Sequence, residues 1–350
     1  MTMLFQHPDF DAHEQVVFAH DPVSGLRAII AVHDTTLGPA LGGCRIWDYD
    51  CEAAALADVL RLSRGMSYKA ALAGLPLGGG KAVILTAPGR PKSPAMLRAM
   101  GAAVERLGGR YVTAEDVGSS VEDMDAVAAA TRHVAGRDGD GGDPSPFTAR
   151  GVFLCLQAAV RHRLGRDLEG VHVAVKGLGH VGFGLAGLLH KAGARLTVAD
   201  IDAGRVARVR EAFGAGAVPV TAIAEIAADV FAPCALGGDL NENSILRLGS
   251  GIVCGAANNQ LATDEDDLRL ARRGVLYCPD YLVNAGGIIS VARGPLGLAA
   301  AEVDARLASL PETLAEVLAA AQREASGPGA VADRIARARF RPEAARRMSA

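Results

Sequence analysis

The sequence has few aromatic residues, no closely spaced cysteine pair and no long apolar run. Aromatic side chains make up 4% of its 350 residues, and the six cysteines are widely scattered. Because no C-x-x-C pair occurs, we expect neither a disulfide framework nor a zinc site. The chain has no uninterrupted stretch of 18 apolar residues, and its N-terminus lacks a basic region followed by an apolar run. These absences predict a cytoplasmic protein with reduced thiols.

Neither sign of charge dominates the sequence. It contains 36 Lys and Arg against 39 Asp and Glu, which gives a formal net charge of −3. The basic residues are spread along the chain, and this distribution argues against a nucleic-acid footprint and against a polybasic membrane patch. We therefore expect small-molecule partners and no bound metal, nucleic acid or membrane.

The composition is that of a folded protein with two domains. Half of the residues are hydrophobic, which excludes global disorder, and the length predicts two domains at roughly 150 residues each. The segment 136–146 is rich in Gly, Asp and Pro and forms the predicted boundary. We expect an N-terminal domain over 1–135, joined by C-terminal helices over about 325–350, and a second domain over 147–324.

Apolar spacing predicts alternating strands and helices in both domains. In the first, a helix over 52–64 is expected to begin after an Asp50 cap and to end at Gly65. In the second, short apolar runs alternate with helical patterns, which is typical of βαβ units around a buried parallel sheet. The sequence thus predicts an α/β fold. The helical segment 303–346 is expected to pack back onto the first domain.

A glycine-rich loop in the second domain is the clearest binding signal. Gly177, Gly179 and Gly182 form a G-x-G-x-x-G pattern directly after the predicted strand 171–176 and open a helix. Such glycines permit a tight turn, close approach of a pyrophosphate and close helix–strand packing. The next predicted strand ends in Asp200, whose carboxylate can bind an adenosine ribose hydroxyl. This favours NAD over NADP, because a 2′-phosphate would meet a negative charge.

Two other interpretations of this loop remain open from the residues alone. The glycines could build only a tight turn, with Asp200 capping the following helix. His180 lies inside the loop and is interpreted as a spacer rather than as a catalytic residue.

Two lysines in the first domain lie in apolar, glycine-rich surroundings. A phosphate-loop interpretation of the segment around Lys69 and Lys81 fails, because Leu75 occupies the first glycine position and Ala82 follows the lysine. Paired, partly buried cations disfavour each other's protonation, so one lysine can act as a general base while the other holds a carboxylate. A structural ion pair or a snorkelling side chain is the alternative. Asp116 follows a predicted strand, at the edge where open α/β sheets bind ligands.

Seven ordered segments, from about residue 18 to 340, carry a resemblance to a known family. They are Gly38–Arg45, the two-lysine segment 65–82, Thr113–Gly118, Asp143–Pro146, Gly177–Gly182, Gly255–Gln260 and Pro279–Gly287. Together they resemble the glutamate/leucine/phenylalanine/valine dehydrogenase family in its short amino-acid branch. The resemblance implies two α/β domains with a deep cleft between them, the second of Rossmann type, and a homo-oligomer assembled through the N-terminal domain.

The resemblance also implies a reaction and a set of roles. Family members convert an L-amino acid, NAD and water reversibly into a 2-oxo acid, NADH and ammonium. By motif match, Lys69 would hold the substrate α-carboxylate, Lys81 would activate water, and Asp116 would shuttle the proton of the amino group. Asn259 would help to position the substrate. The cofactor residues would be Thr148, Gly177, Leu178, Gly179, His180, Val181, Gly182, Asp200, Cys234, Ala235 and Asn258.

The side-chain pocket implied by the resemblance is aliphatic. It would be formed by Leu41 beside the Gly42-Gly43 pair, and by Ile288 and Val291. A lysine and a hydroxyl residue that would bind a distal carboxylate are both missing, so leucine, valine or isoleucine is expected rather than glutamate.

Three alternatives to a branched-chain substrate stay open. Asp143 is more frequent in phenylalanine enzymes of the family, so an aromatic substrate, phenylalanine or tryptophan, is the first. A non-catalytic NAD-sensing protein and a hydroxy-acid oxidoreductase are the others. The sensor would have no reason to keep Lys69, Lys81 and Asp116 together. The hydroxy-acid enzyme would need a His–carboxylate pair, for which the sequence shows no convincing partner of His180 or His133.

Overall fold

The computed structural model describes residues 4–86, 91–137, 143–235 and 237–341, which form two compact units. Unit 1 contains the chain up to Asp143, Ser290–Ala300 and the segment from Ala336 onward. Unit 2 contains Pro144–Ile289 and Ala301–Ile335. Compared with the predicted boundaries, 290–300 therefore lies in unit 1, and 325–335 lies in unit 2. The expectation that the segment 303–346 packs onto the first domain is met only by its end, since 303–335 belongs to unit 2 and the described residues 336–341 belong to unit 1.

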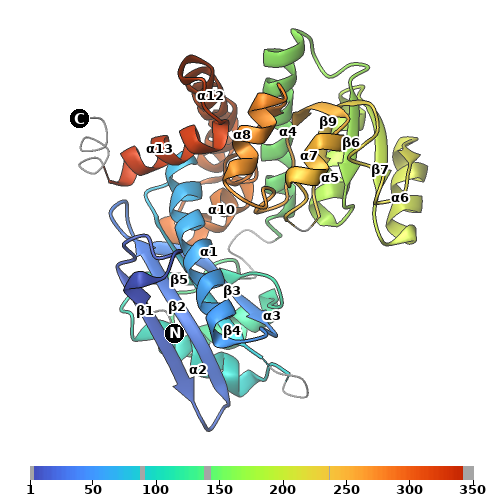
Figure 1. Cartoon of the computed structure of the whole chain (residues 1–350). Coiled ribbons are helices and arrows are strands. Elements are labelled where there is room, and N and C mark those ends of the chain that lie inside the picture. The colour runs from blue at the N-terminus through green and yellow to red at the C-terminus, as the bar shows by residue number, and fades with distance from the viewer. Residues whose placement is uncertain (1–3, 87–90, 138–142, 236, 342–350) are drawn as a thin grey trace. The chain divides into compact units, whose positions relative to one another are not determined.

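Unit 1 is built on a mixed five-stranded sheet (Figure 1). Its strands are β1 (Gln15–Asp21), β2 (Leu26–Asp34), β3 (Ala40–Trp47), β4 (Gly78–Leu85) and β5 (Tyr111–Glu115). The order is β1-β2-β4-β3-β5, and β3 runs parallel to both β4 and β5. The strands β3, β4 and β5 therefore end at the same edge of the sheet.

Helices cover both faces of this sheet. They are α1 (Glu52–Leu72), α2 (Pro94–Glu105) and α3 (Val121–Ala128), preceded by a short turn η1 (Leu4–Gln6). Ile29 and Val83 pack with Leu60 of α1, whereas the alternate residues Ile30 and Ile84 pack with α2 and α3. This alternation follows the two-residue period of a strand. Helix α1 therefore covers one face of the sheet, and α2 and α3 cover the other.

The predicted first residue of α1, Glu52, is confirmed, whereas its predicted cap and end were wrong. Its N-cap is Cys51, without a side-chain cap bond, and not Asp50. The helix also continues through Gly65 to Leu72, because one glycine costs only about 1 kcal/mol in a helix whose buried face packs on the sheet. In consequence Lys69 lies on the last turn of a helix and not in a loop.

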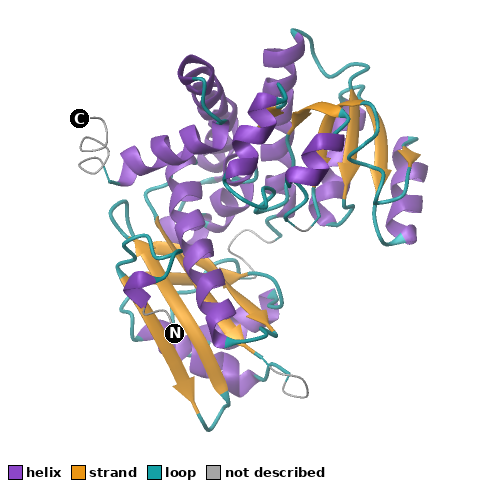
Figure 2. Ribbon diagram, viewed as in Figure 1, coloured by secondary structure: helices purple, strands orange, loops and turns teal. Residues whose placement is uncertain are grey.

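Unit 2 is a doubly wound parallel sheet with helices on its faces (Figure 2). Its strands are β6 (His172–Lys176), β7 (Arg195–Ala199), β8 (Gly216–Ala217), β9 (Ala228–Pro233), β10 (Ser250–Val253) and β11 (Leu276–Tyr277). The order β11-β10-β9-β6-β7-β8 is the 3-2-1-4-5-6 order of a Rossmann fold. The predicted two-domain α/β architecture is confirmed.

The helices that follow residue 144 in the described chain are α4 (Ser145–Leu164), α5 (His180–Lys191), α6 (Ala203–Phe213), α7 (Glu242–Arg247), α8 (Glu265–Arg272), α9 (Asp280–Val283), α10 (Gly286–Val291), α11 (Arg293–Leu296), α12 (Ala300–Glu324) and α13 (Pro328–Phe340). The end of α13 belongs to unit 1, where Arg337 donates a hydrogen bond to Tyr68 Oη at 2.6 Å.

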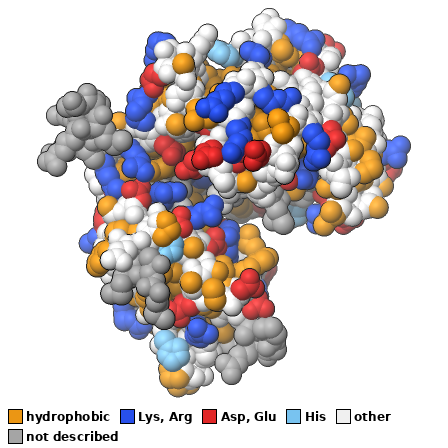
Figure 3. All heavy atoms as spheres, viewed as in Figure 1, with side chains coloured by type: hydrophobic (Ala, Val, Ile, Leu, Met, Phe, Trp, Pro, Cys, Tyr) orange, Lys and Arg blue, Asp and Glu red, His pale blue; other side chains and the backbone are white. Residues whose placement is uncertain are grey.

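Among the described helices, none has both the length and the apolar character needed to cross a membrane. On the face in Figure 3, acidic and basic side chains are interspersed, in keeping with the small net charge.

Candidate active site

Lys81 and Asp116 form an ion pair in unit 1. The Nζ atom of Lys81 lies 3.0 Å from Oδ2 of Asp116. Lys81 lies within β4, on the α1 face shared with Val83, and is 4% exposed. Asp116 follows the last residue of β5, so its side chain stands at the common end of the parallel strands. The structure thus brings together the two residues that the sequence predicted as catalytic.

Arg45 is a further charged residue of this site, to which the sequence assigned no role. Its Nε atom donates to Asp116 Oδ2 at 3.0 Å, and its Nη1 atom donates to Asp58 Oδ2 at 2.9 Å. Asp58 also accepts a hydrogen bond from Tyr49 Oη at 2.6 Å. Arg45 does occur in one of the family-like segments, but no spacing rule shows which carboxylates it contacts. That information depends on the packing of α1 against β3.

The two cations determine the charge state of Asp116. Burial by itself raises the pKa of this carboxyl group. The charges of Lys81 and Arg45, and the hydrogen bonds that both donate, outweigh burial and hold the pKa below its usual value. Asp116 is therefore ionised and faces a lysine.

Glycines allow the strands to approach closely beside this ion pair. A Cβ atom on Gly42 would lie 1.7 Å from the carbonyl oxygen of Gly80, and one on Gly43 would lie 2.7 Å from Cβ of Asp116. Both contacts are far shorter than van der Waals distance. Close strand packing thus explains why residues 42 and 43 are both glycine. The predicted contribution of the Gly42-Gly43 pair to substrate binding remains a proposal.

The other predicted substrate residues are divided between the units. Lys69 is half-buried on the last turn of α1, and Leu41 is buried in β3 opposite Gly79 and Val112. Val291 belongs to unit 1, and Ile288, three residues earlier on α10, is buried in unit 2.

The glycine loop of unit 2 connects β6 to α5. A Cβ atom on Gly177 would lie 2.7 Å from the backbone nitrogen of Ala235, and one on Gly182 would lie 2.0 Å from the oxygen of Gly177. A Cβ atom on Gly179 would meet no atom within 4 Å, so space remains at the second glycine. These three environments fit the roles of turn, phosphate approach and helix packing. The loop can hold a dinucleotide pyrophosphate.

Asp200 lies at the end of β7, next to this loop. Its Oδ2 accepts a hydrogen bond from the backbone N–H of Leu178 at 2.6 Å, and its Oδ1 accepts one from that of Asp202 at 2.8 Å. A carboxylate offers about four acceptor sites, so capacity is left for a ribose hydroxyl. Its interpretation as the cap of the following helix is wrong, since Asp202 is the N-cap of α6.

The remaining cofactor candidates follow the ends of the parallel strands. Cys234 and Ala235 come directly after β9, which neighbours β6 where the strand order reverses. Ligands bind at such a switch point in open α/β sheets. Asn258 follows β10, and its Oδ1 accepts a hydrogen bond from Asn284 Nδ2 at 2.8 Å.

Four further predicted residues have distinct surroundings. Thr148 lies on α4 and donates a hydrogen bond to the carbonyl oxygen of Pro144. Asn259 is exposed and has a φ of 52°, which is uncommon outside glycine. His180 is exposed at the first position of α5, and Val181 follows it half-buried. These positions do not by themselves assign a role.

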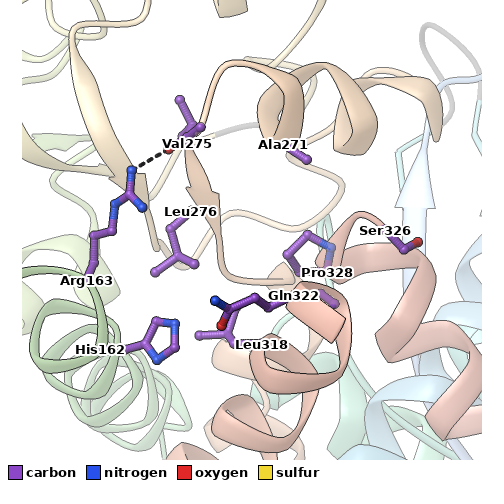
Figure 4. Close-up of a pocket in the computed structure, with 11 residues that line it drawn as sticks. His162, Arg163, Ala271, Val275, Leu276, Leu318, Gln322, Ser326 and Pro328 are labelled. Atoms are coloured by element: carbon purple, nitrogen blue, oxygen red, sulfur yellow. Dashed lines mark hydrogen bonds between the residues drawn. The ribbon is translucent and has the colours of Figure 1, made fainter. Parts of the chain in front are cut away.

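Unit 2 also contains a cavity of about 410 Å³, between the ends of α4 and α8, strand β11 and helices α12 and α13 (Figure 4). Arg163 on its wall donates a hydrogen bond to the carbonyl oxygen of Gly274 at 2.9 Å, and His162 lies beside Leu318 and Gln322. None of the predicted site residues is among its lining residues. We therefore assign it no part in the chemistry.

Comparisons with known proteins place the chain among dehydrogenases. The model of the Glu/Leu/Phe/Val dehydrogenase dimerisation domain matches residues 13–133, and that of Glutamate/Leucine/Phenylalanine/Valine dehydrogenase matches residues 200–327. The chain is 46% identical to leucine dehydrogenase of Bacillus cereus over 345 residues, which cover 97% of this chain and 94% of the relative. It is equally identical to valine dehydrogenase of Streptomyces virginiae over 345 residues, with 95% of each chain covered.

One solved structure is similar in both sequence and fold. It is the L-tryptophan dehydrogenase from Nostoc punctiforme, with 42% identity and a TM-score of 0.83, over 96% of this chain and 97% of that one. A glutamate dehydrogenase from Thermus thermophilus shares the fold, with 23% identity and a TM-score of 0.75 over 97% of this chain and 90% of that one.

Proposed function

The chain belongs to the glutamate/leucine/phenylalanine/valine dehydrogenase family and is an amino acid dehydrogenase, and from that premise we propose that it catalyses the NAD-dependent, reversible oxidative deamination of a branched-chain L-amino acid. The products are the 2-oxo acid, NADH and ammonium, with water as the second reactant. The observation that carries this proposal is the buried Lys81 paired with Asp116 at 3.0 Å. A non-catalytic NAD sensor has no use for such a pair, and no relative supports that alternative.

The proposed roles follow from the charges of the side chains. Lys69 holds the substrate α-carboxylate, and Asp116 accepts a proton from the amino group. NAD, when bound, would supply the acceptor for the hydride of the α-carbon, so that an imine is left on the substrate. Lys81 must first release its own proton to solvent, and as a neutral amine it then takes a proton from the water that attacks the imine carbon. Because Lys81 faces Asp116, proton uptake by Asp116 removes a negative charge opposite Lys81, so the two steps are coupled.

The aliphatic residues Leu41, Ile288 and Val291 support a branched-chain substrate. Relatives named for leucine, valine and tryptophan lie between 42% and 46% identity, so overall identity does not discriminate between these substrates. The three aliphatic residues argue against glutamate, because none of them carries a charge that can pair with the distal carboxylate of glutamate. An aromatic amino acid is the second candidate, favoured by Asp143 and by the tryptophan-named relative.

A substrate panel tests the proposal. We expect kcat/KM for L-leucine, L-valine or L-isoleucine to exceed that for L-phenylalanine, L-tryptophan and L-glutamate, with about 10- to 200-fold discrimination per methylene. NADH formation at alkaline pH is the readout. Ile288→Ala should shift the ratio toward L-phenylalanine because it widens the pocket. If the unaltered protein had its highest kcat/KM with L-phenylalanine or L-tryptophan, the proposed aliphatic pocket would be wrong. The proposed chemistry of the lysines would be unaffected.

We propose NAD as the cofactor, held by Gly177–Gly182 and Asp200. Because like charges placed together cost on the order of a few kcal/mol, Asp200→Ala should lower the preference for NAD over NADP by about 10²-fold. The ratio of kcat/KM values for the two cofactors is the measurement. Asp202→Ala is the matched control, since it removes the same charge two residues away. An unchanged ratio in Asp200→Ala would show that another residue discriminates between the cofactors.

We also propose that the N-terminal domain forms a homo-oligomer and carries the catalytic lysines, while the Rossmann unit binds NAD. The description of the family model over residues 13–133 as a dimerisation domain supports this assembly. Thr148, Cys234, Ala235 and Asn258 would border the nicotinamide, and Asn259 would contact the substrate.

A further inference from the structure

Arg45 divides one positive charge between two carboxylates. Its guanidinium donates to Asp116 Oδ2 at 3.0 Å on one side and to Asp58 Oδ2 at 2.9 Å on the other. Arg45 projects from β3 and Asp58 from α1, so the contact spans the interface between the sheet and this helix. With Lys81 included, the four side chains carry two positive and two negative charges.

Without the negative charge of Asp58, the positive charges of Lys81 and Arg45 would both act uncompensated on one oxygen atom of Asp116. Asp116 Oδ2 lies 3.0 Å from both Lys81 Nζ and Arg45 Nε. A carboxylate held by two uncompensated cations is a poor proton acceptor, because each cation favours the ionised form. The negative charge of Asp58 offsets that of Arg45 and thereby makes Asp116 a better proton acceptor.

Tyr49 fixes Asp58 in this position. Its Oη donates to the same Asp58 Oδ2 that Arg45 contacts, at 2.6 Å. Burial, followed by the hydrogen bond with Asp58, raises the pKa of the Tyr49 phenol, so it stays a protonated donor. Two donors from β3 and from the chain after it thus converge on one oxygen of Asp58.

We propose that Asp58 is a positioning residue for the reaction, which, with Tyr49, shares the Arg45 guanidinium with Asp116 and so preserves the ability of Asp116 to accept the substrate proton. This inference depends on the proposed function, in which Asp116 is that acceptor. Of the other acids near Asp116 in the described chain, Asp123 is paired with Lys92, and Glu115 has no ion pair with Arg45. Asp58 is therefore the acid that can perform this task.

The test is Asp58→Asn in the full-length protein. We expect kcat for amino acid oxidation to fall about tenfold, while KM for the amino acid and for NAD changes less than about twofold. The solvent deuterium isotope effect on kcat should rise, because proton transfer becomes more limiting. Asp58→Glu should restore most of the activity. Asp50→Asn is the matched control, since Asp50 is an exposed acid nearby with no ion pair to Arg45 among the described contacts.

A double-variant cycle separates this role from a general effect on folding. In an Arg45→Gln background, Asp58→Asn should lower kcat by less than about twofold, because coupling vanishes when the mediating residue is gone. Tyr49→Phe, a milder change, should lower kcat in the same direction by about two- to threefold. An equal tenfold loss in both backgrounds would overturn the proposal, as would an unchanged isotope effect. Wild-type protein that turns over no amino acid would instead refute the proposed function.

Discussion

Lys81→Ala is expected to lower kcat for amino acid oxidation by about 10³-fold while leaving the affinity for NADH unchanged. Lys81 is buried in β4 of unit 1, outside the glycine loop that follows β6, so its loss removes the group that activates water without altering the dinucleotide site. Steady-state kinetics and NADH fluorescence titration give the two quantities.

The matched control for this experiment is Lys92→Ala. Lys92 is also a lysine of unit 1 paired with an aspartate, Asp123, and among the described contacts it forms no hydrogen bond or ion pair with Asp116. We expect kcat within about twofold of the wild-type value in this variant. Lys81→Ala protein that retained turnover, or that lost NADH affinity, would show that the proposed role of Lys81 is wrong.

The second large effect is expected for Asp116→Asn. The amide keeps the shape of the side chain but cannot accept the substrate proton, so kcat should fall by about 10²- to 10⁴-fold. It also leaves Lys81 and Arg45 without their shared countercharge, so the thermal unfolding temperature should drop, since breaking an ion pair in a partly buried site is costly.

Glu115→Gln is the control for Asp116→Asn, because the two acids are adjacent in sequence. Glu115 is the last residue of β5 and is exposed, and among the described contacts it forms no ion pair with Lys81 or Arg45. Activity close to wild type is expected in this variant. If Glu115→Gln lowered kcat as much as Asp116→Asn does, the proton-accepting role would belong to Glu115 and not to Asp116.

The sequence predicted the Rossmann half of the molecule well, because its signals are local. Glycine spacing, a preceding apolar run and an acid at the end of the next strand are all readable within about 30 residues. The Ser93 cap of α2 and the Ser120 capping box of α3 are local signals of the same kind, since each involves residues only three positions apart.

The failures concern features that depend on packing. The sequence ended α1 at Gly65, since nothing local shows that the sheet supports the helix for two further turns. It likewise gave no role to Arg45, Asp58 and Tyr49, which come together only when α1 lies on β3. Resemblance could supply the roles of Lys81 and Asp116 but not the arginine between Asp116 and Asp58.

The most direct test of the central claim is the stoichiometry of the reaction. Purified protein is incubated with NAD and the preferred branched-chain L-amino acid, and NADH and ammonium are measured in the same sample. Oxidative deamination predicts one ammonium for each NADH, with no NADH when the amino acid is omitted. NADH formed without ammonium would contradict the deamination chemistry, and neither product with any amino acid of the panel would contradict the assignment of the catalytic lysines.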